Sequence, residues 1–219
     1  MSDNPATIML VDDHPLLRKG LKQLISMEDD LAVIAECSNG ADALVQAAEL
    51  DPDLIILDLN MQGMDGIETL KRMRDQGVTS RIVMLTVSDA DEDIVAAITH
   101  GADGYLLKDM DPELLMEQII RAIDGKMVLS EAITEVLATA LRRPSAPTSS
   151  KLDTLTNRER EILELIAKGM SNKLIARELD ISDGTVKVHV KHLLKKLGLR
   201  SRVEAAVWMV NHEQHTDKS

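Results

Sequence analysis

The sequence LIILDLNM at residues 54–61 joins four consecutive apolar residues to an acidic and polar turn. A short Ile- and Leu-rich run of this kind is typical of a strand that is buried on both faces of a parallel sheet. Four comparable runs occur at residues 8–11, 31–35, 82–85 and 105–107. Apolar residues at helical spacing separate several of them, at residues 15–27, 67–73 and 112–123. Five βα units predict an α/β domain with an open parallel sheet and helices on both faces.

Acidic and polar residues stand at the ends of four predicted strands, where such sheets place their functional groups. These residues are Asp12, Asp13, Asp58, Thr86 and Lys108. Any one of them alone is explained as a solvated loop residue, but the set favours a site. Three carboxylates at one edge repel one another unless a hard cation lies among them, and Mg²⁺ is the simplest choice. A lysine and a hydroxyl beside them suit a phosphoryl group, with Asp58 as the nucleophile of an acyl phosphate.

Four motifs carry a resemblance to a known family: VDDH at 11–14, LDLNM at 57–61, LT at 85–86 and GYLLK at 104–108. With them, residues 7–125 resemble the receiver domain of bacterial two-component response regulators, which has a flavodoxin-like (βα)5 fold. The resemblance implies that a sensor histidine kinase phosphorylates Asp58.

The resemblance also implies roles for the surrounding residues. The implied Mg²⁺ ligands are the side chains of Asp12, Asp13 and Asp58 and the backbone carbonyl of Asn60. Thr86 and Lys108 would bind the phosphoryl oxygens, and Tyr105 would change rotamer on activation. The family usually has proline where this chain has Gln62, a difference that affects the turn and leaves the ligand set intact.

Two other interpretations of the Asp58 region, an EF-hand loop and a phosphatase site, are each excluded by one residue. An EF-hand loop that starts at Asp58 would need glutamate at its twelfth position, where the chain has Thr69. A phosphatase with an aspartate nucleophile would normally carry a second aspartate at the position of Asn60, which cannot ionise. We therefore predict a phosphoacceptor switch that is not an enzyme, with at most slow self-dephosphorylation.

The last third of the chain shows short helices with clear starts. Capping-box patterns occur at Thr156–Glu159 and Ser201–Glu204. Residues 180–182 form a tight turn before a helix that begins at residue 183 and ends at Gly198. Two helices joined by a three-residue turn, within a basic four-helix unit, predict helix-turn-helix DNA binding.

The helix after this turn has two different faces. At 100° per residue, an apolar stripe that includes Val186 and Val190 is expected to face the core. Lys191, Lys195 and Val188 lie on the opposite, outward face, where a valine methyl could contact thymine in the major groove. Lysines alone would equally fit a solvated helix face. His189 and His192 have no third ligand nearby, so the sequence gives no reason for a metal site there.

Residues 153–211 resemble the four-helix DNA-binding domain of the NarL/FixJ (LuxR-type) regulators. The resemblance rests on LTxREREIL at 155–163, on NKxIA at 172–176 and on TVKVH at 185–189. It implies that double-stranded DNA is contacted by Thr185, Lys187, Val188, Lys191 and Lys195. It further implies a homodimer on DNA, and RNA polymerase is a candidate partner. Three stretches are similar to the nitrate/nitrite regulators of this family, at 58–61, 101–109 and 187–192; nothing in the residues themselves points to nitrate.

The composition and the charge distribution limit how the chain can be organised into domains. The 219 residues contain one cysteine, Cys37, which excludes a disulfide framework. No signal peptide or membrane span is evident, and we expect a cytoplasmic protein without a membrane partner. Residues 1–150 carry a net charge of −15 and residues 151–219 carry +3. We expect a receiver domain at 1–127, a connecting helix and flexible linker at 128–152 and a DNA-binding domain at 153–219.

Two rival functions come from other classes. The first is a phosphoryl-transfer enzyme whose C-terminal module supports oligomers, which many phosphate turnovers per site would reveal. The second is a DNA-binding protein with an inactive front domain, against which the complete five-residue site argues. If the domains dock, the acidic front domain would cover the outward helix face, and phosphorylation would favour the open form. A fragment that starts near Ser150 should then bind DNA without phosphorylation.

Overall fold

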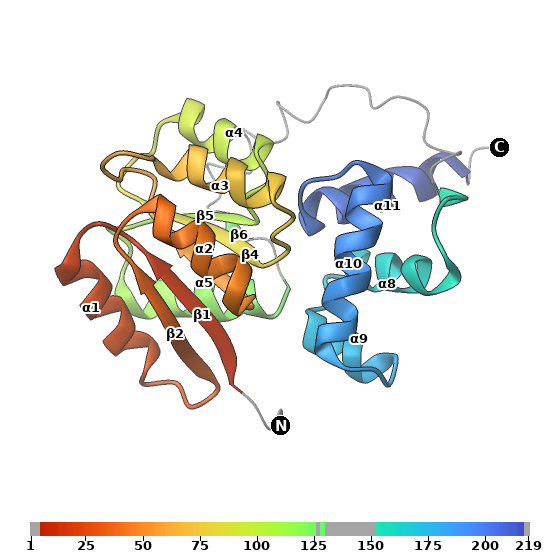
Figure 1. The fold of residues 1–219 in the computed structure, drawn as a ribbon, viewed down its shortest axis with the longest axis horizontal. Coiled ribbons are helices and arrows are strands. Elements are labelled where there is room, and N and C mark those ends of the chain that lie inside the picture. Colours follow the sequence, from red (N-terminus) through yellow and green to blue (C-terminus); the bar gives the residue numbers. More distant parts are fainter. Residues whose placement is uncertain (1–4, 126–127, 130–151, 217–219) are drawn as a thin grey trace.

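The computed structural model describes residues 5–125, 128–129 and 152–216, as two domains that lie side by side (Figure 1). The strands are β1 (Ala6–Val11), β2 (Leu31–Cys37), β3 (Leu54–Leu57), β4 (Arg81–Thr86), β5 (Gly104–Leu107) and β6 (Val128–Leu129). The helices of the first domain are α1 (Pro15–Ile25), α2 (Gly40–Leu50), α3 (Gly66–Asp75), α4 (Asp91–Thr99) and α5 (Pro112–Ile123). Those of the second are α8 (Asn157–Ala167), α9 (Asn172–Glu178), α10 (Asp183–Leu197) and α11 (Arg202–Thr216).

The strands form one parallel sheet in the order β2-β1-β3-β4-β5-β6. The five predicted parallel strands are therefore confirmed. The short strand β6 pairs with β5 at Gly104 and Tyr105. Its two residues begin the segment that the sequence assigned to a connecting helix and linker, and they are extended because they pair with the edge of β5. The remainder of that segment, at residues 130–151, lies outside the described residues.

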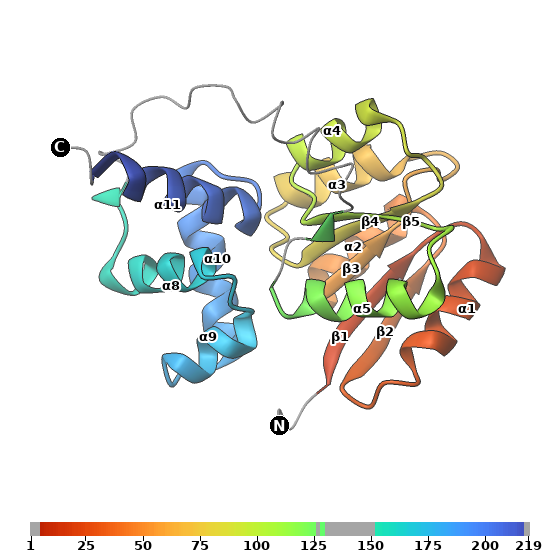
Figure 2. The ribbon, with the colours of Figure 1, turned by 180° about the vertical axis from the view of Figure 1, so that it is seen from behind.

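Helices cover both faces of the sheet, with α1 and α5 on one and α2, α3 and α4 on the other (Figures 1 and 2). Successive strand residues point to opposite faces. In β1, Ile8 and Leu10 pack toward α1 and α5, whereas Met9 and Val11 pack toward the other layer. Both layers are almost purely aliphatic, as the near absence of aromatic residues requires. The central strands are buried on both faces, which explains their unbroken apolar runs.

The second domain is a helical unit around its own aliphatic core. The predicted capping box at the start of α8 is present, with Thr156 and Glu159 each accepting a backbone hydrogen bond from the other. Ser182 caps α10, and Gly198 ends it with a positive φ of 71°. The second predicted box is only half formed, because the Glu204 carboxylate accepts from the N–H of Arg200 instead of Ser201. Helix α11 extends to Thr216.

The α9–turn–α10 arrangement confirms the predicted helix-turn-helix. Asp180 in the turn has a φ of 52°, a left-handed conformation that aspartate tolerates better than most residues. No helix among the described residues has both the length and the apolar character that a membrane crossing requires.

Candidate functional site

An acidic pocket lies at the carboxyl ends of β1 and β3, where the sequence placed it. Asp12 and Asp58 are both buried, with 6% and 2% of their surface exposed. Lys108, just after β5, places its Nζ 2.8 Å from Asp12 Oδ2 and 2.8 Å from Asp58 Oδ2. Three strand ends that are remote in sequence thus meet in one pocket, and one ammonium group partly neutralises two carboxylates.

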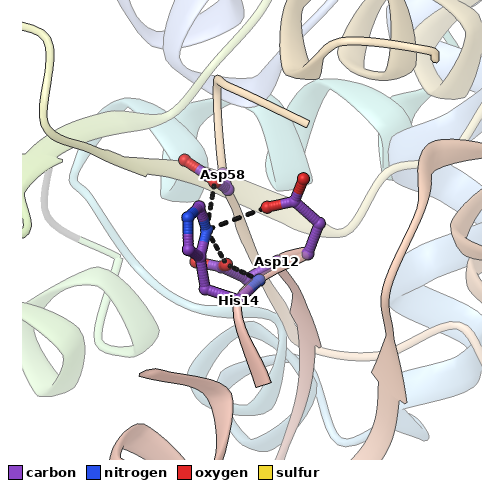
Figure 3. A group of neighbouring side chains, drawn as sticks. Asp12, His14 and Asp58 are labelled. Carbon is purple, nitrogen blue, oxygen red and sulfur yellow. Dashed lines mark hydrogen bonds and ion pairs between the residues drawn. The ribbon is translucent and has the colours of Figure 1, made fainter. Parts of the chain in front are cut away.

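His14 is a member of this pocket that the sequence reasoning did not assign. Its ring points toward Asp12 and Asp58 (Figure 3), with Nδ1 3.2 Å from Asp12 Oδ1 and 4.0 Å from Asp58 Oδ2. The same Nδ1 atom lies 2.8 Å from Asp13 Oδ1. The signal was available, because His14 directly follows the two aspartates in the sequence.

The pocket has the donor set of a cation site. Ligand atoms of Asp12, Asp13, His14 and Asp58 all lie within 4.8 Å of one another. Two buried carboxylate oxygens accept no hydrogen bond of good geometry among the described residues and have close ionic partners instead, Asp13 Oδ1 with His14 Nδ1 at 2.8 Å and Asp58 Oδ2 with Lys108 Nζ at 2.8 Å. Three carboxylates share one lysine here, so the pocket favours a further cation. Oxygen-rich acidic sites of this kind fit a hard divalent cation.

Backbone groups hold the carboxylates of this pocket in place. The N–H of Asn60 donates to Asp58 Oδ1 over 3.3 Å, and the N–H of Gln62 donates to Asp13 Oδ2 over 3.1 Å. Gly66 begins α3 directly against Asp58, where any Cβ would overlap the Asp58 carbonyl oxygen. The glycine is therefore needed for the close approach of α3 to the pocket.

Burial is the main cause of an elevated pKa at Asp58. The nearby charge of Asp12 raises the pKa further, whereas Lys108 and the N–H of Asn60 lower it. The pKa of Asp58 is therefore raised overall, and keeping its carboxylate ionised in this buried pocket costs free energy. Perturbed carboxylates of this kind are typical of functional sites.

Thr86 and Tyr105 lie next to the pocket on β4 and β5, and both are fully buried. Both contact Ser88: the Thr86 hydroxyl accepts from its N–H over 3.1 Å, and the Tyr105 hydroxyl donates to its carbonyl over 3.0 Å. Burial, together with nearby Asp93, raises the pKa of Tyr105 to about 12. The segment that follows β4 thus connects Thr86, predicted to bind the phosphoryl oxygens, with Tyr105, predicted to change rotamer, and Ser88 is a contact that the sequence did not predict.

The outward face of α10 has the predicted character. Val186 and Val190 are buried in the helical core, whereas Thr185, Val188, Lys191 and Lys195 are exposed. Val188 is 54% exposed. The face is therefore basic with one apolar side chain near its centre.

Lys187 is half-buried because the first domain covers it, and Lys191 also reaches that domain, with its Cε 3.0 Å from the place that a Cβ on Gly77 would take. The Lys187 Nζ donates to the carbonyl of Asp51 over 2.7 Å and lies 3.4 Å from Asp51 Oδ2 and 3.5 Å from Asp53 Oδ1. Burial alone would lower the pKa of Lys187, but the carboxylates of Asp53, Asp51 and Asp183 outweigh it and raise the pKa. Asp51 and Asp53 precede β3, and nothing in the sequence identified them as partners of Lys187.

Further contacts fix the same interface. Lys173 of α9 donates to the carbonyl of Pro5 over 3.0 Å, and its Nζ lies 3.7 Å from Asp53 Oδ2. Gly125, after α5, approaches the Gly169 carbonyl so closely that a Cβ on Gly125 would overlap the oxygen. All these groups of the first domain lie at the amino ends of the strands, opposite the acidic pocket.

The comparisons with known proteins agree with this fold and pocket, which are those of a two-component response regulator. Residues 8–120 match the response regulator receiver domain, and residues 153–209 match the LuxR family of bacterial regulatory proteins. The chain belongs to the LuxR family of response regulators, with a receiver domain followed by a helix-turn-helix DNA-binding domain. The receiver implies a histidine kinase as partner, and the second domain implies DNA.

Relatives match along nearly the whole chain. The nitrate/nitrite response regulator protein NarL of Escherichia coli K12 is 58% identical over 208 residues, which are 95% of this chain and 96% of NarL. The nitrate/nitrite response regulator protein NarP of the same strain is 48% identical over 203 residues, 93% of this chain and 94% of NarP. The crystal structure of the response regulator ChrA of a heme-sensing two-component system is 31% identical with a TM-score of 0.51, covering 96% of this chain and 98% of ChrA.

Proposed function

We propose that this response regulator controls nitrate/nitrite-responsive genes, including those of anaerobic respiration, and that phosphorylation of Asp58 switches its DNA binding. The observation that carries the switch is the pocket in which Lys108 contacts both Asp12 and Asp58 at 2.8 Å. The nitrate/nitrite assignment is supported by the identity to NarL and NarP.

The proposed transfer uses the Asp58 carboxylate as nucleophile. One of its oxygens attacks the phosphorus of a phosphohistidine on the kinase; the new O–P bond forms as the P–N bond breaks, and the imidazole leaves with the electron pair. Lys108 and the hydroxyl of Thr86 would then hold the phosphoryl oxygens. Mg²⁺, bound by Asp12, Asp13, Asp58 and the carbonyl of Asn60, would neutralise charge on the transferred group. The close grouping of the Asp12, Asp13 and Asp58 carboxylates, with ligand atoms within 4.8 Å of one another, supports this ligand set.

Asp13→Asn tests the metal site. We expect weaker Mg²⁺ binding, because the variant removes one of the side-chain charges that hold the cation. Titration of purified protein with Mg²⁺ under isothermal calorimetry would measure the change. Asp109→Asn, at an exposed position beside Lys108, is the matched control and should leave Mg²⁺ affinity unchanged. Equal affinities for wild type and Asp13→Asn would contradict the assignment of Asp13.

We propose that the chain is a switch rather than an enzyme. Asn60, in the place where an aspartate-based phosphatase needs a second acid, cannot protonate a leaving group. The proposal predicts one phosphoryl group per chain with slow loss, whereas many phosphate turnovers per site would favour the enzyme reading. A homodimer on DNA and contact with RNA polymerase belong to the same proposal, supported by the LuxR-type second domain.

We propose that α10 enters the major groove and that Lys187, Val188 and Lys191 face the bases, with Thr185 and Lys195 nearby. The exposed basic face with Val188 at its centre supports this orientation. The receiver contacts Lys187 through Asp51 and Asp53, so DNA cannot reach this side chain in the arrangement described. Phosphorylation would therefore act by favouring an open arrangement.

Lys191→Ala tests the DNA-binding face. On phosphorylated protein we expect specific affinity to fall by about 1–3 kcal/mol if the lysine contacts a guanine edge. If it meets only phosphate, all sequences should weaken alike, and the salt slope should fall by about one. Fluorescence anisotropy at several salt concentrations separates these outcomes, with Lys168→Ala at the exposed end of α8 as control.

Val188→Ser should mainly change the preference at one base pair, because it removes an apolar contact with a thymine methyl. Lys187→Ala should also weaken the phosphorylated complex, as Lys191→Ala does. Footprints identical to wild type for all three variants would show that α10 does not enter the groove.

A further inference from the structure

A cleft between the two domains lies at the end of the sheet opposite Asp58. The receiver contributes Asp53 and Arg81 to its lining, and the DNA-binding domain contributes Lys173, Lys187 and Arg202. Four of these five side chains are cationic. Asp53 is already engaged by both lysines, with distances of 3.7 Å and 3.5 Å to their Nζ atoms.

Arg81, at the start of β4, has a buried donor without an acceptor. The residue is only 5% exposed, and its Nη2 atom has no hydrogen-bond partner among the residues that the structure describes. Arg81 forms no ion pair within the same residues; the Asp103 and Asp124 carboxylates are near enough to raise its pKa, but burial outweighs them and lowers it. Burying a charged group without a partner is costly, so such a donor is rarely left unused in a folded protein.

Arg202, at the start of α11, faces the same cleft from the other domain. It is 6% exposed; its Nη1 donates to the Asn172 side chain over 3.0 Å and its Nη2 donates to the carbonyl of Met170, and both acceptors are neutral. Burial lowers the pKa of Arg202 strongly, and the positive charge of Arg81 lowers it further. The Asp103 carboxylate that partly offsets this repulsion is itself paired with Arg74 at 2.7 Å. The interface thus brings together two buried guanidinium groups whose one shared carboxylate, Asp103, is paired with a third arginine, Arg74.

We propose that this cleft binds a small oxyanion of the phosphate class, held between Arg81 of the receiver and Arg202 of the DNA-binding domain. A tetrahedral oxyanion offers acceptors to both planar guanidinium groups at once, a geometry that arginine recognises better than lysine does. The anion would offset the repulsion between the two cations. The lysines, held by Asp53, add positive charge around it.

Because its two principal ligands come from different domains, the anion binds tightly only when the domains are docked. By linkage it must then stabilise the docked arrangement over the open one. This second step rests on the proposed covering of α10 by the receiver; the binding site itself does not. A phosphate-class anion would therefore hold the unphosphorylated regulator off DNA without occupying Asp58.

Isothermal calorimetry of the full chain with inorganic phosphate tests the site. The titration is done without Mg²⁺, to keep phosphate out of the Asp58 pocket, and at constant ionic strength set with chloride. We expect saturable binding at one site per chain and at least tenfold weaker binding for Arg81→Gln. Arg121→Gln, on the exposed face of α5, is the matched control for the loss of one receiver arginine.

A second control separates this site from the DNA-binding face. Lys195→Gln should leave phosphate binding unchanged, because Lys195 is exposed on α10 outside the cleft. Arg81→Lys keeps the positive charge but loses the paired donors of the guanidinium group, so its phosphate affinity should lie between those of wild type and Arg81→Gln. This variant replaces Arg81→Gln in the experiment if the glutamine variant does not fold. Phosphate binding that is absent, unaltered in both Arg81 variants, or abolished by Lys195→Gln would overturn the proposal.

A separate experiment tests whether anion binding in the cleft weakens DNA binding. At matched ionic strength, phosphate should weaken operator binding by the unphosphorylated wild type more than chloride does, and this difference should disappear in Arg81→Gln. Phosphate that binds through Arg81 without changing DNA affinity would overturn the coupling and leave the anion site standing. The anion site and the proposed control of DNA binding can therefore be disproved independently of each other.

Discussion

Asp58→Asn should abolish phosphorylation of this chain by a small phosphodonor such as acetyl phosphate in the presence of Mg²⁺. The amide keeps the shape of the side chain and removes the nucleophilic oxygen that would form the acyl phosphate. Labelling should fall to background, whereas wild type should accept up to one phosphoryl group per chain. Phosphate-affinity gel electrophoresis or intact-mass measurement would record the result.

Two controls make this result specific. Asp109→Asn removes an exposed carboxylate beside Lys108 and should label as wild type does. Circular dichroism of Asp58→Asn should show an intact fold, because the buried position is refilled by a side chain of the same size. Labelling of Asp58→Asn equal to that of wild type would show that another residue is the acceptor.

Gly125→Ala should release the DNA-binding domain from the receiver. The new Cβ would overlap the carbonyl oxygen of Gly169, and this contact is between two backbones, so neither side can yield by changing a rotamer. The overlap with Gly169 penalises only the docked form, whereas the strain from the positive φ is common to both forms, so the population shifts toward the open form. We expect the unphosphorylated variant to bind operator DNA at least about tenfold more tightly than wild type, equivalent to roughly 1.4 kcal/mol.

Gly169→Ala is the matched control for this experiment. Both glycines have positive φ, 105° at Gly125 and 81° at Gly169, so alanine is strained at either position. A Cβ on Gly169 would meet nothing closer than the Gly125 carbonyl oxygen at 4.0 Å. Anisotropy with unphosphorylated proteins would compare the two. Equal DNA affinities for Gly125→Ala and wild type would show that docking does not limit binding, and dimerisation through the receiver would become the simpler switch.

Local signals in the sequence determined most of the fold. The buried run at residues 54–57 became β3 without any change of bounds, and the helix at 112–123 became α5 in the same way. Unbroken apolar runs mark the strands that are buried on both faces, and burial with a period of 3.6 marks the inner face of α10, so both patterns are readable without the structure. The acidic pocket was predictable because the carboxyl ends of parallel strands meet at one edge of the sheet.

Contacts between segments that are far apart in the sequence could not be predicted from such local patterns. That Val128 and Leu129 extend the sheet depends on a free edge of β5, a property of the assembled fold. The inclusion of His14 in the pocket was signalled by its position after Asp12 and Asp13, but its orientation depends on how α1 leaves β1. Ser88 joins Thr86 and Tyr105 only once β4 and β5 pair.

The sequence by itself determined the two domains, the place of Asp58 and the basic face of α10, because each follows from periodicity along a short segment. The tertiary structure alone decided that Lys187 meets Asp51 and Asp53, and that Arg81 and Arg202 face one cleft. These pairs are more than 100 residues apart in the chain. Their contact depends on the docking of two separately packed cores, and no local pattern of hydrophobic or charged residues specifies the surfaces that meet.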